Sequence, residues 1–230
     1  MNVLALDSSQ IQAAISLVVD DKLVATSEGS IAVSHSEALL LLIDRLLKQS
    51  QLTLDKIDAF GVGVGPGSFT GIRIGCATVK TLAQVLDKPI FPFSSLKALA
   101  LSCDPNLGGL VAMANAYQGQ VFVGWLNQNQ TWFEDVMSAE EWCQKHGLHI
   151  ASNLRFCGNG AVAYRSSIES VLAGRSIEFT ESTLYSSAPG VARAIVGVTP
   201  VSYAQLQAHY MRRSQAEIKL EATVAKGKGA

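Results

Sequence analysis

The residues with the clearest potential for chemistry are the glycines of residues 61–87, which read GVGVGPGSFTGIRIGCATVKTLAQVLD. Glycine-rich loops that begin a helix bind phosphate in many nucleotide-binding proteins, because their backbone amides approach the anion closely. The P-loop pattern requires Lys and then Ser or Thr after its last glycine, and no Lys follows Gly71. The dinucleotide pattern fails too, because Gly65, Gly67 and Gly71 are spaced one residue too widely. We therefore expect a structural or interface role for this segment.

Two short polar segments could form a second kind of phosphate site. Asp7, Ser8 and Ser9 follow the first apolar strand, and a carboxylate with hydroxyls at a strand end can hold phosphate and a metal ion. The alternative is an Asp turn, in which the carboxylate accepts from its own backbone. Loops of the first kind usually contain a glycine, which is missing here, so the turn is favoured. The segment Gly158, Asn159 and Gly160 follows a later strand in the same way.

The histidines and cysteines form no recognisable metal or catalytic site. His146 and His149 are three residues apart, but Gly147 lies between them at an expected helix end and no third ligand is near in sequence. The chain has no G-x-S-x-G nucleophile motif and no C-x-x-C pair. We expect no catalytic residue and no metal ligand, and we interpret the chain as an interaction subunit. The cysteines are expected to be reduced thiols of a cytosolic protein: Cys76, Cys103, Cys143 and Cys157.

The elements that would position these residues follow one pattern twice. The order strand, strand, strand, helix, strand, helix, strand, helix fits the first hundred residues and again the remainder. A turn-rich stretch at residues 104–109 separates the two halves. An antiparallel meander followed by alternating strands and helices predicts a mixed sheet with helices packed on it. We therefore predict an α/β protein of two lobes, residues 1–103 and 104–230, with a disordered tail from about residue 220.

Local signals predict where several of these elements begin and end. Asp20-Asp21 is a hairpin signal between the second and third strands. Ser34 and Ser138, each followed three residues later by Glu, are expected to cap helices, and the second of these helices should run to about His146. The segment from Tyr203 is weakly patterned.

The helix over residues 68–87, with Ser68 as its expected N-cap, is apolar on two sides. One broad stripe has the spacing of a core face. A second face contains small or aliphatic residues, and the clearly polar strip, which includes Arg73, is narrow. Glycine costs about 1 kcal/mol against Ala inside a helix, so Gly71 and Gly75 indicate close approach to another backbone. The second face predicts a covered surface formed by Ile74, Ala77, Thr78, Thr81 and Val85, with Leu41 from the preceding helix.

The bulk composition excludes several other classes of protein. The formal net charge of the 230 residues is −1, so the chain has no strongly basic field to attract nucleic acid on its own. The longest apolar run is far shorter than the roughly 20 residues of a membrane span. No basic segment precedes the first apolar residues, so a secretory signal is not expected. We expect a cytoplasmic protein without a membrane contact.

Several motifs resemble the TsaB (YeaZ) family of tRNA threonylcarbamoyladenosine proteins. They are the N-terminal LALDSS, the sequence SHSE at residues 34–37, GVGPGSFTGIRIG with CATVKTLA after it, and SSLKALA at residues 94–100. The resemblance covers the first hundred residues well and the second half loosely, through Gly158-Asn159-Gly160 and Tyr210-Met211-Arg212. Where the family often has charged residues, this chain has Asn115-Ala116-Tyr117 and Gln120-Val121-Phe122.

The resemblance implies an actin-like (ASKHA, ribonuclease H-like) fold and a non-catalytic scaffold or dimerisation subunit. It implies that the chain supports the catalytic paralogue TsaD, works with the ATPase TsaE, self-associates through the same surface and meets tRNA only through the complex. ATP or ADP and a metal ion are expected on the partner subunits, and no cofactor on this chain alone. The implied partner or dimer interface is Leu41, Arg45, Gly67, Phe69, Thr70, Gly71, Ile74, Ala77, Thr78, Thr81 and Val85.

Two alternatives remain open at the level of sequence. One is a glycopeptidase-like protease, which would need a nucleophile or metal ligands. The other is an actin-like, ATP-dependent small-molecule kinase, in which Asp7, Ser8 and Ser9 with Gly158, Asn159 and Gly160 would be the nucleotide loops. In the favoured interpretation these loops are vestigial.

Overall fold

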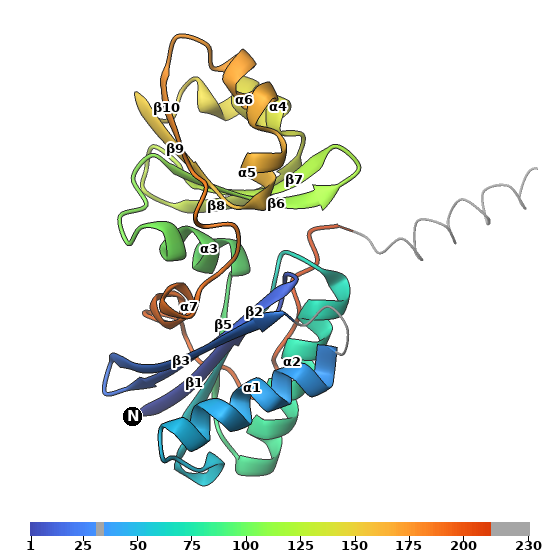
Figure 1. The fold of residues 1–230 in the computed structure, drawn as a ribbon, viewed down its shortest axis with the longest axis vertical. Coiled ribbons are helices and arrows are strands. Elements are labelled where there is room, and N and C mark those ends of the chain that lie inside the picture. The colour runs from blue at the N-terminus through green and yellow to red at the C-terminus, as the bar shows by residue number, and fades with distance from the viewer. Residues whose placement is uncertain (31–34, 213–230) are drawn as a thin grey trace, which may run out of the picture.

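The computed structural model describes residues 1–30 and 35–212, together with the backbone but not the side chains of His35 and Ser36. The chain forms two lobes, each built on a five-stranded sheet, and Figure 1 shows one above the other. The predicted capping role of Ser34 and the predicted disordered tail lie outside the described residues. The first half contains β1 (Asn2–Asp7), β2 (Gln12–Val19), β3 (Lys22–Ser30), α1 (His35–Gln49), the 3-10 turn η1 (Leu54–Lys56), β4 (Ala59–Gly63), α2 (Phe69–Leu86), β5 (Ile90–Phe93) and α3 (Ser95–Cys103).

The second half repeats this order with shorter helices. Its first helix begins at the predicted cap Ser138, whose side chain accepts from the Glu141 amide. The helix ends as α at Trp142 and continues as a wider π turn, where a single helix to about His146 was expected. The elements are β6 (Leu110–Tyr117), β7 (Gln120–Leu126), β8 (Trp132–Met137), α4 (Ala139–Trp142), η2 (Cys143–Gly147), β9 (Asn153–Cys157), α5 (Asn159–Ala163), α6 (Arg165–Val171), β10 (Ser176–Thr180) and α7 (Ala188–Ala194).

The two sheets share one topology, which agrees with the duplicated pattern of the sequence. The first has the strand order β3-β2-β1-β4-β5 and the second β10-β9-β6-β7-β8. In each, three strands form an antiparallel meander and two later strands add in parallel. The first hairpin turns at Asp20 and Asp21, both with positive φ, as the paired aspartates predicted.

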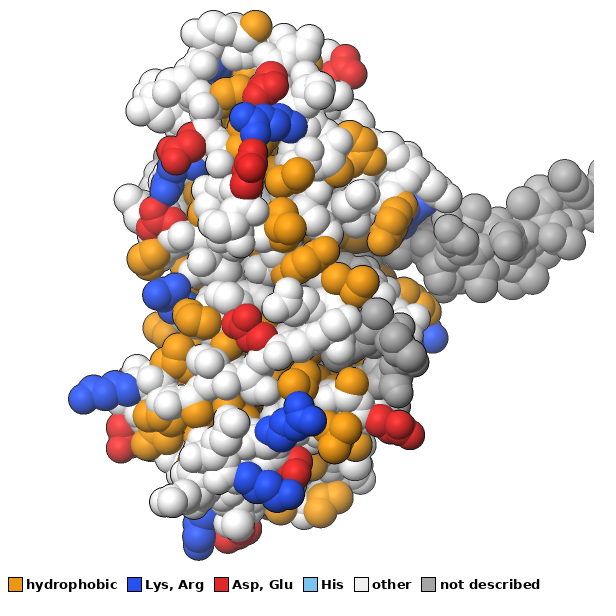
Figure 2. Space-filling model, in the orientation of Figure 1, with side chains coloured by type: hydrophobic (Ala, Val, Ile, Leu, Met, Phe, Trp, Pro, Cys, Tyr) orange, Lys and Arg blue, Asp and Glu red, His pale blue; other side chains and the backbone are white. Residues whose placement is uncertain are grey.

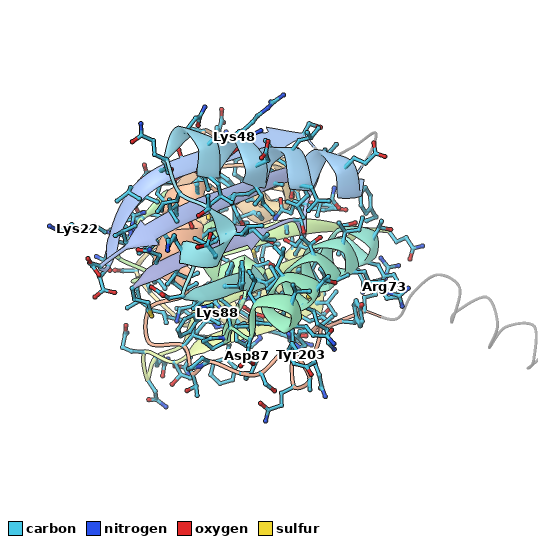
Figure 3. All side chains as sticks on the ribbon, turned by 90° about the horizontal axis from the view of Figure 1, so that it is seen from below. Lys22, Lys48, Arg73, Asp87, Lys88 and Tyr203 are labelled. Carbon is cyan, nitrogen blue, oxygen red and sulfur yellow. The ribbon has the colours of Figure 1, made fainter. Side chains whose placement is uncertain are left out.

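Strand β1 contributes side chains to two separate cores, because successive side chains of a strand point to opposite faces of the sheet. Leu4 and Leu6 belong to a cluster with residues of α1 and α2. Val3 and Ala5 belong to a second cluster with residues of α3 and α7. The first sheet is therefore covered by α1 and α2 on one face and by α3 and α7 on the other, and Figure 3 shows α1 and α2 beside each other.

The last described segment returns to the first lobe after passing through the second. Helix α7 packs on β1, β2 and β3, and Val201 forms an antiparallel bridge with Ile90. Leu206 is buried in the core that α1 and α2 share. Residues 203–212 have a weak hydrophobic pattern, yet Tyr203 and Leu206 pack with the first core. The residue ranges predicted for the two lobes stay a prediction.

Candidate interface helices and inter-lobe cleft

The turn after β1 is closed by the carboxylate of Asp7, whose side chain is only 2% exposed. Its Oδ1 accepts from the Ser9 amide at 3.0 Å and from the Ser95 hydroxyl at 3.1 Å. Its Oδ2 has no hydrogen-bond partner among the described residues. The first contact is the Asp turn that the sequence favours, and the second ties the turn to the beginning of α3.

The glycines of the α2 segment face this same turn. A Cβ on Gly67 would lie within 3.0 Å of the Ser9 carbonyl oxygen, and one on Gly71 within 3.0 Å of the Ser8 carbonyl oxygen. The Ser68 amide donates to the Ser9 carbonyl at 2.6 Å, and the Ser8 hydroxyl donates to the Gly71 carbonyl at 2.9 Å. The four-residue glycine spacing is thus clearance for a buried turn. The turn at residues 7–9 and the glycine-rich segment, which were predicted as separate candidate sites, therefore pack against each other.

Helix α2 begins where the sequence predicts. The Ser68 side chain accepts from the Gly71 amide at 3.3 Å, which satisfies one free amide of the first turn. Ile72, Val79 and Ala83 are buried toward the first sheet. The helix therefore has a fixed inner side, made by these residues with Gly71 and Gly75, and an outer side free of the sheet.

The outer side of α2 contains much of the predicted interface, and α1 adds two residues. Val85 is 76% exposed and Leu41 of α1 is 55% exposed. Ile74 is half-buried and packs against the first core, whereas Gly71 is buried and contributes no surface. We use the term α1–α2 face for the predicted residues that the structure leaves exposed: Leu41, Arg45, Thr70, Ala77, Thr81 and Val85. The half-buried members are Gly67, Phe69, Ile74 and Thr78.

The second predicted loop is held by backbone contacts. The Gly158 amide donates to the Thr183 carbonyl at 2.9 Å, and the Asn159 amide to the Leu184 carbonyl at 3.1 Å. The Asn159 side chain accepts from the Asn115 amide at 2.9 Å. A Cβ on Gly160 would lie within 3.0 Å of the backbone of β6. These glycines therefore permit close packing between α5 and β6.

A cleft of about 580 Å³ lies between the two lobes. One residue of each predicted loop, Ser9 and Asn159, reaches its wall. The beginning of α2, the end of β6 and residues 209–212 supply most of the remaining lining. The structure thus brings the two loops to one cleft, while Asp7 stays behind the wall in its own turn.

Residues 209–212 cross the mouth of this cleft from one lobe to the other. The His209 amide donates to the Val64 carbonyl at 2.7 Å, and the Arg212 guanidinium donates to the Ala116 carbonyl at 2.5 Å. The Tyr210 ring lies 4.5 Å from the Phe69 ring, between centroids. The Arg73 guanidinium lies 3.8 Å from the Phe69 centroid, a cation–π contact, and its Nε donates to the Tyr210 hydroxyl at 3.2 Å.

Residues 209–212 were not among the residues predicted to form a site. The available signal was Tyr210-Met211-Arg212, which the resemblance singled out although its surroundings are weakly patterned. Arg73 was placed in the polar strip of its helix, and Figure 3 shows it in the first part of α2. The three side chains Phe69, Arg73 and Tyr210 fix the last described residues on the beginning of α2.

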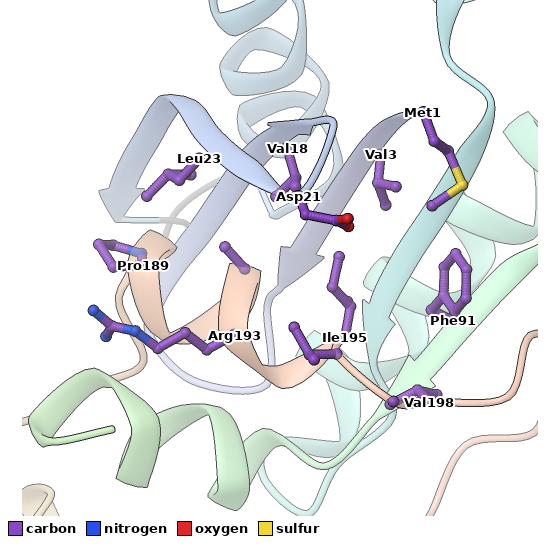
Figure 4. A pocket seen from close by; sticks show the side chains of 13 residues that line it. Met1, Val3, Val18, Asp21, Leu23, Phe91, Pro189, Arg193, Ile195 and Val198 are labelled. Carbon is purple, nitrogen blue, oxygen red and sulfur yellow. The ribbon is translucent and has the colours of Figure 1, made fainter. Parts of the chain in front are cut away.

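A second cavity, of about 360 Å³, lies on the face of the first sheet that α3 and α7 cover. Figure 4 shows it between the strands and the segment of α7, with Val3 and Val18 from the sheet and Ile195 and Val198 after the helix. Asp21 and Arg193 are the charged residues of its wall. It contains none of the predicted site residues.

Within residues 1–30 and 35–212, no group of three His, Cys, Asp or Glu side chains is placed to hold a metal ion. The His146 ring instead packs 4.8 Å from the Trp125 ring, between centroids. On the face drawn in Figure 2, Lys and Arg side chains are interspersed with Asp and Glu. No helix in the described part of the chain is long and apolar enough to cross a membrane.

Comparison with protein families gives a match over most of the chain. Residues 29–220 match the model named TsaD, described as tRNA N6-adenosine threonylcarbamoyltransferase. The chain belongs to the TsaD family.

Similar proteins include TsaB proteins. The tRNA threonylcarbamoyladenosine biosynthesis protein TsaB of Bacillus subtilis (strain 168) is 29% identical over 177 residues, which cover 75% of this chain and 77% of that protein. The protein of the same name from Haemophilus influenzae is 43% identical over 67 residues, which cover 29% of this chain and only 28% of that protein. The resemblance to the TsaB (YeaZ) family is confirmed.

Solved structures confirm the fold. YeaZ from Pseudomonas aeruginosa superposes with a TM-score of 0.76 at 24% identity, over 91% of this chain and 99% of that chain. The (R)-2-hydroxyglutaryl-CoA dehydratase component A of Acidaminococcus fermentans superposes with a TM-score of 0.52 at 11% identity, over 89% of this chain and 98% of that chain. At these identities the likeness is one of fold alone, and the predicted actin-like α/β fold with two mixed sheets is correct.

Proposed function

We propose that this TsaD-family chain is a non-catalytic subunit in tRNA threonylcarbamoyladenosine biosynthesis, and that it binds a TsaD-type catalytic protein through its α1–α2 face. The same face pairs two copies of the chain when the partner is absent. The ATPase TsaE joins the complex, and tRNA contacts the assembly rather than this chain alone. ATP or ADP and a metal ion belong to the partner subunits, and the assembly works in the cytoplasm.

The observation that carries this proposal is the exposure of aliphatic side chains on the outer side of a helix whose inner side is fixed. Leu41 and Val85 are more than half exposed, and Leu40, which precedes Leu41 in α1, is 51% exposed. Single exposed apolar residues are ordinary, but several on two adjacent helices are typical of a contact surface. The small side chains of Ala77 and Thr81 between them would allow a partner helix to approach closely.

The two enzymatic alternatives find less support in the described residues. The Asp7 carboxylate is engaged by Ser9 and Ser95, and the 158–160 loop is engaged by backbone groups. A protease of this chain would need an activated nucleophile, and Ser95, the buried hydroxyl beside Asp7, donates to that carboxylate and has no histidine among its hydrogen-bond partners.

The proposal is tested by charging the α1–α2 face. The double variant Thr81→Arg, Val85→Arg should elute as a monomer and fail to co-elute with a TsaD protein in size-exclusion chromatography. It should also fail to support threonylcarbamoyl transfer to tRNA when TsaD, TsaE and the adenylate-forming enzyme are supplied. Arginine at both sites places two like charges on each copy and removes the apolar contact.

The matched control carries the same charges on another surface. Val24 and Val196 are 54% and 77% exposed and lie on β3 and after α7. The variant Val24→Arg, Val196→Arg should keep the wild-type elution and support modification. If both double variants bind TsaD equally well, the α1–α2 face is not the interface. If modification proceeds fully without this chain, the assignment as a required subunit fails.

A further inference from the structure

The wall of the inter-lobe cleft is rich in aromatic side chains and poor in negative charge. Three of the five tyrosines of the chain line it. None of the described residues that line the cleft is Asp or Glu, whereas Arg212 and His209 are among them. The aromatic members of the lining are Phe69, Tyr117, Phe122, Tyr185 and Tyr210. A wall of this kind favours a ligand that has planar rings and negative charge.

Tyr117 lies at the rim of the cleft with most of its side chain exposed. It is 74% exposed, and its φ of +61° is uncommon for a residue other than glycine. The Asn115 side chain accepts from the Tyr117 amide at 2.8 Å, and Gln118 and Gly119, also with positive φ, close the turn between β6 and β7. The turn thus presents a large ring to solvent at the cost of backbone strain, and strained residues of this kind cluster at binding sites.

The Arg212 guanidinium is fixed next to this turn. It donates to the Ala116 carbonyl at 2.5 Å and to the Gln118 side chain, so it bonds the residues on both sides of Tyr117. Figure 1 shows the β6–β7 hairpin beside the end of the described chain. A positive charge is therefore held next to an exposed aromatic ring, and these are the two groups that bind a phosphate and a base.

A second ring and a second guanidinium meet at the beginning of α2. Arg73 lies 3.8 Å from the Phe69 centroid and donates through Nε to the hydroxyl of Tyr210, which is 40% exposed. Among the ion pairs formed within residues 1–30 and 35–212, none includes Arg73 or Arg212. Both positive charges are therefore available to an anion.

The same cleft contains polar atoms that are buried and unpaired. Ser9 is 1% exposed, and its hydroxyl has no hydrogen-bond partner among the described residues. The side-chain oxygen of Gln10 is buried without such a partner too, and both residues line the cleft. Buried polar atoms are nearly always paired in folded proteins, so these two oxygens mark a place for a polar group of a ligand.

We propose that the rim of the cleft binds single-stranded RNA. The Tyr117 and Tyr210 rings stack on unpaired bases, and the Arg73 and Arg212 guanidiniums bind phosphates of the backbone. The Ser9 hydroxyl binds a ribose hydroxyl inside the cleft. A single strand exposes its bases for such stacking, whereas the bases of a duplex are paired inside it. Aromatic rings and arginine side chains bind single strands with little dependence on base sequence.

The composition of the wall favours a strand of RNA over a free nucleoside triphosphate. A triphosphate is usually bound together with a divalent metal ion that carboxylates hold, and the described lining has no carboxylate. The Asp7 carboxylate is 2% exposed and is engaged by Ser9 and Ser95 behind the wall. The exposed rings and the two guanidiniums lie at the rim, where a strand can pass from one lobe to the other.

The position of the rim connects it with the proposed function. Phe69 and Thr70 line the cleft and also belong to the predicted interface with a TsaD-type protein. RNA at the rim would therefore lie next to the catalytic partner. The identity of the RNA as tRNA rests on the proposed function, whereas the binding of a single strand by this chain does not. The net charge of −1 predicts that the chain alone binds weakly.

The first test measures the binding of RNA by the full-length chain alone. Fluorescence anisotropy at low salt should detect binding of a labelled oligoadenylate, and Tyr117→Ala should weaken it about tenfold because one base loses its stacking partner. Tyr117→Phe keeps the ring and should bind as the wild type does. Phe133→Ala removes an exposed ring of β8 outside the cleft lining and should have no effect. Arg212→Gln should reduce the slope of log affinity against log salt concentration by about 0.7.

The proposal fails if the wild-type chain does not bind oligoadenylate, or if Tyr117→Ala binds it as tightly as the wild type. It also fails if a duplex RNA of equal length binds as tightly as the single strand, since a duplex offers no unpaired base. Displacement of the oligoadenylate by ATP and Mg²⁺ at an equal nucleotide concentration would assign the cleft to a free nucleotide instead.

The second test uses the complex with a TsaD protein. Tyr117 lies outside the α1–α2 face, so Tyr117→Ala should co-elute with TsaD, while the KM for tRNA rises about tenfold and kcat changes little. An unchanged KM in the co-eluting complex would overturn the role of the rim in tRNA binding. If the wild-type chain binds oligoadenylate but not TsaD, the proposed function fails and the RNA-binding rim stands.

Discussion

The inner and outer sides of α2 differ in what they demand of a side chain. On the inner side, Gly71 leaves no room for a Cβ, because the Ser8 carbonyl occupies that space. On the outer side, Val85 is 76% exposed and touches little of its own chain. One eighteen-residue helix thus combines positions that the fold fixes with positions that the isolated fold leaves free.

This difference shows that a motif can have a distinctive sequence for two reasons: packing within the chain, or contact with a partner. The sequence GPGSFTGIRIG has the appearance of an anion loop, yet its glycines are required by a neighbouring turn and its cap by the first turn of the helix. The outer residues have no such internal reason. We propose that a partner covers the apolar side chains among them, and the proposed function rests on this.

The largest effect is expected at the inner glycine. Gly71→Ala should lower the free energy of unfolding by about 3 kcal/mol, the upper part of the range for overpacking, because the new methyl meets a backbone oxygen that cannot rotate away. Chemical denaturation followed by circular dichroism measures it. If there were room for the methyl group, Gly71→Ala would instead raise the free energy of unfolding, because Ala is about 1 kcal/mol more favourable than Gly inside a helix.

Gly75, on the same side of the helix, provides a control substitution with a smaller expected loss of stability. A Cβ there meets the Ser8 hydroxyl, a side-chain atom that can turn aside while losing its bond to Gly71. Gly75→Ala should therefore cost less than Gly71→Ala. Equal losses at the two positions would show that the turn is not the obstacle.

A smaller effect is expected at Asp7, which distinguishes a structural turn from a vestigial nucleotide loop. Asp7→Ala removes the acceptor of the Ser9 amide and the Ser95 hydroxyl and should cost about 2 kcal/mol, because two buried donors lose their partner. Asp7→Asn keeps one acceptor oxygen and should cost less than half as much in the same denaturation experiment. Both variants that fold should still co-elute with TsaD. Loss of modification in the folded Asn variant would instead assign chemistry to the carboxylate.

Local signals predicted the elements well, and long-range packing produced what they missed. The hairpin at Asp20 and Asp21, the cap at Ser68 and the repeated strand order all depend on near neighbours in sequence. The meeting of Gly71 with Ser8 joins positions 63 residues apart. The spacing of the glycines predicted that some backbone must come close, but nothing in the sequence identified which one.

The contacts of the last described residues with the first lobe could not be predicted for the same reason. Tyr210 contacts Phe69 and Arg73 although 137 positions separate it from the arginine. Leu206 enters a core whose other fully buried members come from the first 90 residues. A segment that contributes one buried residue at a time has no periodicity for a sequence pattern to detect. The interface residues were predicted from the helical wheel together with the resemblance, and both their role and their partner stay predictions.

The smallest effect is expected on the outer side, and it completes the comparison. Val85→Ser should change the free energy of unfolding of dilute, monomeric protein by less than about 0.5 kcal/mol, because the side chain contacts little of its own chain. At higher concentrations self-association would stabilise the wild type by mass action, so its melting temperature should rise with concentration more than that of the variant. Calorimetric scans at several concentrations measure both. A large loss in the dilute monomer would mean that Val85 serves the fold, and α2 would then have no free side to offer a partner.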